Sequence, residues 1–105
     1  MIVDRQPTVE SIGKIFADAV RDDEAVREVW VAEDCEGFII SVFTDEIDIP
    51  HELQIYGHDM DVHKQFPDAL FEVHVNNPRN YTFTSFEKMR SALLPKNAVR
   101  IMSRQ

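Results

Sequence analysis

Glu46-Ile47-Asp48-Ile49 is the segment whose residue types and spacing are best suited to chemistry. It alternates acidic and apolar side chains at the end of a strand-like run that ends at Thr44. If the strand continues through residue 48, its period of two places Glu46 and Asp48 on one face. Glu72 lies in a later alternating run. Carboxylates that converge from two strands suit Mg²⁺, which prefers oxygen ligands. One hypothesis is therefore a catalytic magnesium site at Glu46, Asp48 and Glu72.

A structural role accounts for the same carboxylates. Asp48 stands two residues before a proline, where a short acidic side chain is suited to cap the first turn of a helix. In that interpretation Glu46 is a solvent-facing residue at the strand end. Glu72 would then pair across the sheet with a base, either Arg27 or Arg100. The two interpretations differ in whether the three carboxyl groups converge.

A second group of metal-ligand side chains lies in the segment that follows. His58, Asp59 and His63 combine imidazole and carboxylate groups, which suit zinc or another transition metal. Asp59 and His63 are four residues apart, so they can meet on one face of a helix. A pair of histidines at positions i and i+4 is missing from this segment. The alternative is therefore that these side chains form an exposed polar stripe without a metal. If a metal does bind, His58, Asp59 and His63 are the expected ligands.

Other catalytic patterns are missing from the sequence. The three glycines cannot supply a phosphate-binding loop or a dinucleotide fingerprint. The one cysteine, Cys35, cannot form an internal disulfide, which is typical of a reduced compartment. The N-terminal residues do not form a signal peptide, and no apolar run approaches the length of a membrane span. We therefore expect a cytoplasmic protein with no membrane partner.

The net charge of −8 is unevenly distributed along the 105 residues. Residues 1–75 contain 18 of the 19 acids and 5 of the 11 bases, a net charge of −13, whereas residues 76–105 carry +5. An acidic body repels phosphate groups and so disfavours nucleic acid as a partner. The basic segment over 76–105 is expected either to pack on this acidic body or to bind an acidic partner. Its apolar residues favour packing.

Hydrophobic periodicity predicts the elements that must position these groups. Apolar residues spaced three and four apart predict a helix that begins after Thr8. Alternation predicts a strand over 26–32, and a nearly continuous apolar run predicts a central strand over 38–44 that is covered on both faces. A short acidic turn joins the two as an antiparallel hairpin. A helix over 51–66 and a strand over 70–75 then form a crossover, which places the third strand parallel to the second.

The last third of the chain adds two more elements. A short helix is predicted over 85–94, and an edge strand is predicted over 98–102 after Pro95. The resulting order is α-β-β-α-β-α-β. It predicts one α+β domain over residues 1–105, in which helices pack on a small mixed sheet as a two-layer sandwich.

This arrangement resembles the minimal nucleotidyltransferase core over roughly residues 8–75. The resemblance rests on helix, hairpin, helix and parallel strand, with Glu46-Ile47-Asp48-Ile49 on the second strand and an acid on the third. It implies that Glu46, Asp48 and Glu72 hold Mg²⁺ for nucleotidyl transfer. The family places a Gly-Ser turn between its first two strands to cradle nucleotide phosphates. This chain instead has Glu33-Asp34-Cys35-Glu36-Gly37 there, and its acids repel a triphosphate.

The chain is also similar to small uncharacterised bacterial α/β proteins that end in a Pro-x-Asn-Ala-like turn before a final strand, here Pro95-Lys96-Asn97-Ala98. That similarity implies a bacterial source and supplies no activity. The missing phosphate-binding glycines, the acidic turn and the divided charge favour a non-catalytic protein that binds a protein partner or associates with itself. A divergent magnesium-dependent enzyme and a metal-binding protein are the two alternatives.

Overall fold

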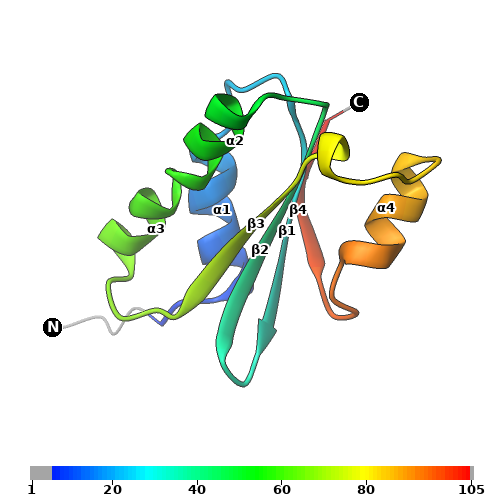
Figure 1. Cartoon of the computed structure of the whole chain (residues 1–105). Coiled ribbons are helices and arrows are strands. Elements are labelled where there is room, and N and C mark those ends of the chain that lie inside the picture. Colours follow the sequence, from blue (N-terminus) through cyan, green and yellow to red (C-terminus); the bar gives the residue numbers. More distant parts are fainter. Residues whose placement is uncertain (1–5, 105) are drawn as a thin grey trace, which may run out of the picture.

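The computed structural model describes residues 6–104, which form a four-stranded mixed sheet with helices on both of its faces (Figure 1). The strand order in the sheet is β3-β2-β1-β4. The predicted α+β class is therefore confirmed. In chain order the elements are α1 (Val9–Ala19), β1 (Val26–Asp34), β2 (Gly37–Thr44), α2 (Ile49–Tyr56), α3 (Asp59–Gln65), β3 (Phe71–Asn76), a 3-10 turn (Pro78–Asn80), α4 (Phe86–Leu93) and β4 (Val99–Ser103).

The first two strands form the predicted antiparallel hairpin. Asp34 lies opposite Gly37 at its closed end. Gly37 has a φ of +137°, and a Cβ atom there would lie 2.2 Å from the carbonyl oxygen of Leu70. Only glycine combines this backbone conformation with so close an approach. Gly37 thus lets the hairpin end pass close to the start of β3, where the N–H of Phe38 donates to that same carbonyl at 2.9 Å.

The crossover after β2 confirms one prediction and corrects another. β3 runs parallel to β2, as the strand–helix–strand spacing predicted. The single helix predicted over 51–66 is wrong, because the segment contains two helices, α2 and α3, separated by a turn at Gly57 and His58. Glycine is a poor helix former, and Asp59 and Asp61 are well placed to stabilise the N-terminus of a new helix.

The two faces of the sheet are covered to different extents. α1, α2 and α3 lie on one side, whereas α4 lies on the other (Figure 1). Val29 and Val31 are fully buried on the side of α1. On the opposite side, the ring of Phe43 contacts Phe86 of α4 at 5.7 Å between centroids. α4 covers the second face here, and Phe43 is fully buried beneath it. The predicted two-layer sandwich is therefore wrong where α4 packs on the sheet.

α1 joins the outer strand β4 to the rest of the core. The predicted cap at Thr8 is confirmed, because its side chain accepts from the N–H of Ser11 in a reciprocal capping box. One turn later, Gly13 lies against Ile101 and Val31, so close that an added Cβ would lie 2.5 Å from Ile101. The missing side chain at Gly13 lets the helix pack directly on β1 and β4.

Candidate functional site

The segment Asp45 to Asp48 forms the connection between β2 and α2, not the end of a strand. β2 ends at Thr44, so the alternation of acidic and apolar residues does not follow a sheet face. Asn77 holds this connection in place and is fully buried. Its Nδ2 donates to the carbonyl of Ile47 at 2.8 Å, and its Oδ1 accepts from the N–H of Ile47 at 3.3 Å. Ile47 is itself buried.

Each of the two acids in this connection has a separate position. Asp48 caps α2, because its Oδ1 accepts from the N–H of His51 at 3.0 Å. The capping role predicted for Asp48 is therefore confirmed. Glu46 is exposed to solvent.

Glu72 lies near the opposite end of the sheet from these two acids. It pairs in register with Ile39, five residues before the end of β2 at Thr44. Five strand residues correspond to roughly 16 Å, and Glu46 and Asp48 follow beyond that point. The structure therefore does not bring Glu46, Asp48 and Glu72 together, as the magnesium hypothesis requires.

The base expected opposite Glu72 is also corrected. Its carboxylate contacts Nε2 of His74 at 3.1 Å, two residues along the same strand. Arg27 pairs with Asp45 at 2.9 Å, and the guanidinium of Arg100 lies 5.8 Å from the Trp30 ring centroid. Glu72 therefore meets a histidine of its own strand and neither of the predicted arginines.

The proposed histidine ligands are directed to different contacts. Nδ1 of His58 lies 3.5 Å from Asp61, and the ring of His63 lies 4.5 Å from that of Phe71. The closest histidine–carboxylate contact is between His51 and Asp23, at 2.7 Å, which the sequence reasoning missed. Among the residues that the structure describes, no three His, Cys, Asp or Glu side chains are arranged to hold a metal ion. His58, Asp59 and His63 therefore do not form the set proposed from their spacing.

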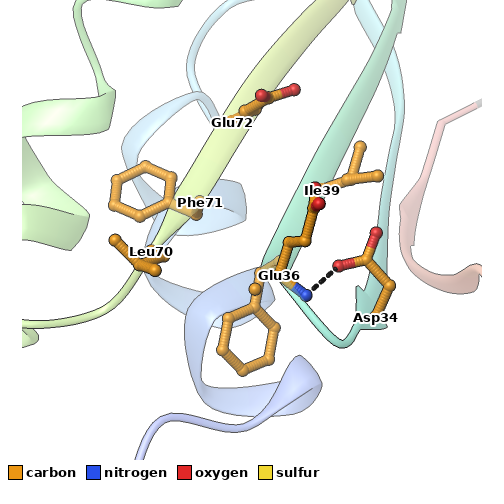
Figure 2. A pocket seen from close by; sticks show the side chains of 8 residues that line it. Asp34, Glu36, Ile39, Leu70, Phe71 and Glu72 are labelled. Carbon is orange, nitrogen blue, oxygen red and sulfur yellow. Dashed lines mark hydrogen bonds between the residues drawn. The ribbon is translucent and has the colours of Figure 1, made fainter.

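An open hollow of about 300 Å³ lies where the hairpin end meets the start of β3 (Figure 2). Asp34, Glu36 and Glu72 line it together with apolar side chains that include Leu70 and Phe71. Asp34 accepts from the backbone N–H of Glu36 at 2.8 Å, which fixes the turn. Three acids and no base in the lining disfavour a phosphate-bearing ligand.

A row of exposed apolar side chains runs along the outside of α2 and α3, and we call it the outer stripe. Its members are Ile49, Leu53, Tyr56 and Met60, which are 54%, 62%, 37% and 58% exposed. Their spacing of four, three and four residues is that of one helical face, although the turn at Gly57 interrupts the helix before Met60. The opposite side of these helices supplies the core residues Ile55 and Val62. Hydrophobic periodicity alone does not separate Leu53, Tyr56 and Met60 from the core-facing residues in the helix predicted over 51–66.

The outer stripe borders an edge of the sheet. β3 is the outermost strand beside β2, and the hydroxyl of Tyr56 accepts from the N–H of Val75 at 3.3 Å. The carbonyl of Leu70 points inward to β2. Because backbone groups alternate in direction along a strand, those of Phe71, Val73 and Val75 point outward. We call these outward groups the β3 edge.

A buried ion pair on the opposite sheet face also went unpredicted. Arg90 of α4 donates two parallel hydrogen bonds to Glu28 of β1, at 3.0 and 2.9 Å. The indole N–H of Trp30 donates to the same carboxylate at 2.6 Å. Only 7% of the Glu28 side chain is exposed. This contact links residues 62 positions apart, so no local sequence pattern identifies it.

Comparisons with known proteins add no information about these residues. Searches against protein-family models, curated proteins and solved structures each return no match. Over residues 6–104, the helices are all too short or too polar to cross a membrane.

Proposed function

We propose that this protein is a non-catalytic module that binds a protein partner through the outer stripe and the β3 edge. The observation that carries the proposal is the outer stripe itself. Leu53 and Met60 are each more than half exposed, although each lies on a helix that supplies a fully buried residue to the core, Ile55 from α2 and Val62 from α3. Large apolar side chains that stay exposed in this way, among polar neighbours, are typical of a protein-binding site.

The energetics favour a partner with an apolar surface. Covering a half-exposed Leu, Ile or Met side chain contributes roughly 1 kcal/mol, about half the value for full burial. Three such side chains and the less exposed Tyr56 give roughly 3–4 kcal/mol, whereas association costs about 4–15 kcal/mol in lost freedom. The outer stripe therefore needs matching apolar groups on the partner, or added backbone hydrogen bonds at the β3 edge.

The arrangement of carboxylates favours binding over nucleotidyl transfer. Glu72 lies near one end of the sheet, and Glu46 and Asp48 lie beyond the other. Metal-assisted transfer would need these three carboxylates to bind the same metal site beside one reacting phosphate. Asp48 is moreover committed to the N-terminus of α2.

Photo-cross-linking from the outer stripe tests the proposal. A photo-reactive side chain at position 53 should give one discrete protein adduct in cells of the source organism, and the same group at Val99 should not. Val99 is a matched control because it is 44% exposed and lies on the opposite sheet edge. With the adduct partner purified, Leu53→Gln should weaken binding about tenfold or more, since a buried polar amide replaces an apolar contact. Equal binding by wild type and Leu53→Gln would contradict the proposal.

A further inference from the structure

α2 and α3, the helices that carry the outer stripe, lie beside β3 (Figure 1), and the Tyr56 hydroxyl accepts from the N–H of Val75 on the β3 edge. We propose that the partner is a second copy of this chain, related by a two-fold axis perpendicular to the sheet at Val73. The two β3 strands then pair antiparallel and join two four-stranded sheets into one. This inference rests on the proposed function, and it names the partner that the same surface takes.

Backbone geometry leaves the β3 edge suited to such pairing. The outward residues Phe71, Val73 and Val75 carry the N–H and C=O groups that a new strand would bond. Unpaired edge groups of this kind readily accept a strand from another molecule. Among the described residues, the contact given for these outward groups is the one from Val75 to the Tyr56 hydroxyl. Tyr56 thus blunts one end of the β3 edge.

The β3 sequence is self-complementary about Val73. A two-fold axis there places Val73 opposite Val73 of the second copy and Phe71 opposite Val75 of the second copy. Glu72 then lies opposite His74 of the second copy, so an acid faces an imidazole in two symmetry-related pairs. Both side chains are exposed, and within one chain they already lie 3.1 Å apart. Opposite charges in cross-strand positions stabilise a pairing, whereas like charges oppose it.

The same axis brings the two outer stripes together. A two-fold axis perpendicular to the sheet keeps α2 and α3 of both copies on one face, next to the shared β3 strands. Tyr56 lies closest to the edge, as its bond to Val75 requires, and Leu53 and Met60 extend the apolar surface along the helices. An isologous interface of this type buries the same patch on both subunits, which is the commonest form of homo-oligomer.

A head-to-tail arrangement is the rival, with the β3 edge of one copy meeting β4 of the next. Residues 45–75 carry eight acids and one lysine, whereas residues 76–105 carry six bases and one acid, so the segments that contain β3 and β4 have opposite net charges. Exposed ion pairs contribute little and are screened by salt. That arrangement would also place the outer stripe near α1, whose exposed side includes Glu10, Lys14 and Asp18. Burial of apolar surface therefore favours the two-fold arrangement.

Sedimentation equilibrium of the full chain tests the inference. We expect a monomer–dimer equilibrium whose dissociation constant changes less than about threefold between low and high salt. The double variant Leu53→Gln and Met60→Gln should weaken dimerisation at least tenfold, and the control Val99→Gln should leave it unchanged. Val73→Pro removes an outward N–H at the pairing centre and should also abolish the dimer.

Tyr56→Phe supplies a test with the opposite sign. It removes only the hydroxyl that occupies the N–H of Val75, so dimerisation should strengthen by about twofold to tenfold. A monomer at all concentrations, or a dimer that all these variants leave unchanged, would overturn the inference. Salt-sensitive, open-ended growth would overturn it in favour of the head-to-tail arrangement. If the chain stays monomeric while the position-53 cross-link still captures a different protein, the second-copy inference fails and the proposed function stands.

Discussion

At the scale of single residues, the segment that first suggested a metal site is held by structural contacts. Asp48 caps α2, Asp45 pairs with Arg27, and Ile47 is buried and clamped by Asn77. The remaining acid, Glu46, is exposed. The alternation of acidic and apolar residues therefore arises here from a tight connection and does not mark a sheet face. Its first apolar residue, Ile47, is buried, whereas Ile49 is exposed.

Asn77 makes two hydrogen bonds to the backbone of Ile47 in this connection, and its removal gives the first prediction for stability. Asn77→Ala should lower the free energy of unfolding by about 2–3 kcal/mol, because the buried N–H and C=O of Ile47 lose their partner. Asn80→Ala is the matched control. Its side chain is exposed and donates to Glu52 at 3.2 Å, so a loss below about 1 kcal/mol is expected. Denaturant titration measures both, and equal losses would contradict the clamp.

These residues also show which contacts a sequence can predict. The Asp48 cap was predictable because its acceptor and donor are three residues apart and follow a known helix-start pattern. The clamp was not, since Asn77 lies 30 residues from Ile47 and sits in what the sequence presents as a turn-rich loop. The pair of His51 and Asp23, 28 residues apart, escaped prediction for the same reason.

At the scale of elements, two glycines have opposite roles in their helices. Gly13 lies within α1, where an added Cβ would meet Ile101 at 2.5 Å and Val31 at 3.1 Å. Gly57 ends α2 in an ordinary helical conformation, with φ −61°. A Cβ there would contact only the carbonyl of Gln54 at 3.3 Å and that of Leu53 at 3.7 Å. The first glycine is required by packing, and the second interrupts a helix without being required by its backbone angles.

Alanine substitution at each position gives the second prediction. Gly57→Ala should raise the free energy of unfolding by about 0.4–1 kcal/mol, because alanine loses less chain entropy on folding. Gly13→Ala makes the same change in helix propensity but should lower stability by about 1–3 kcal/mol, since stiff, branched side chains oppose the new methyl group. Thermal and denaturant unfolding measure the difference. If both substitutions stabilise the protein, α1 does not pack on β4 as described.

Element positions were largely predictable, whereas their faces were not. All four strands were predicted close to their observed positions, and the hairpin and parallel crossover follow from connection length. The outer stripe could not be separated from the core, because α2 and α3 have apolar residues on both sides and periodicity does not state which side faces the sheet. The sheet face that α4 covers could likewise not be predicted from the sequence of α4, since its contacts with Phe43 and Glu28 on distant strands determine that face.

At the scale of the whole molecule, one buried ion pair links the basic segment over 76–105 to the acidic body. Arg90 comes from the basic segment and Glu28 from the acidic body, and their paired hydrogen bonds fix α4 to the second sheet face. Arg104 adds a bond from its guanidinium to the carbonyl of Asp23 at 3.0 Å. The remaining described bases of this segment are exposed and form no ion pair within residues 6–104, and one of them, Arg100, lies over the Trp30 ring.

Removing one partner of the Arg90–Glu28 pair gives the final prediction. Arg90→Ala leaves a buried carboxylate without its cation, so the free energy of unfolding should fall by about 3 kcal/mol. That loss is a large share of the roughly 5–15 kcal/mol that holds a domain of this kind folded. Lys88→Ala is the matched control on the same helix, and its exposed side chain should change stability by less than about 0.5 kcal/mol.

A second change separates loss of the pair from loss of packing. Combining Glu28→Gln with Arg90→Ala removes the uncompensated charge and keeps an acceptor for the Trp30 indole, so it should restore part of the stability lost by Arg90→Ala alone. The cost of Arg90→Ala should also change little with salt, because only 7% of the Glu28 side chain is exposed. Equal losses for the single and double variants would assign the effect to packing of the arginine side chain, whose guanidinium carbon lies 5.2 Å from the centroid of the Phe86 ring. In that case packing of the Arg90 side chain, and not its ion pair with Glu28, holds the basic segment on the acidic body.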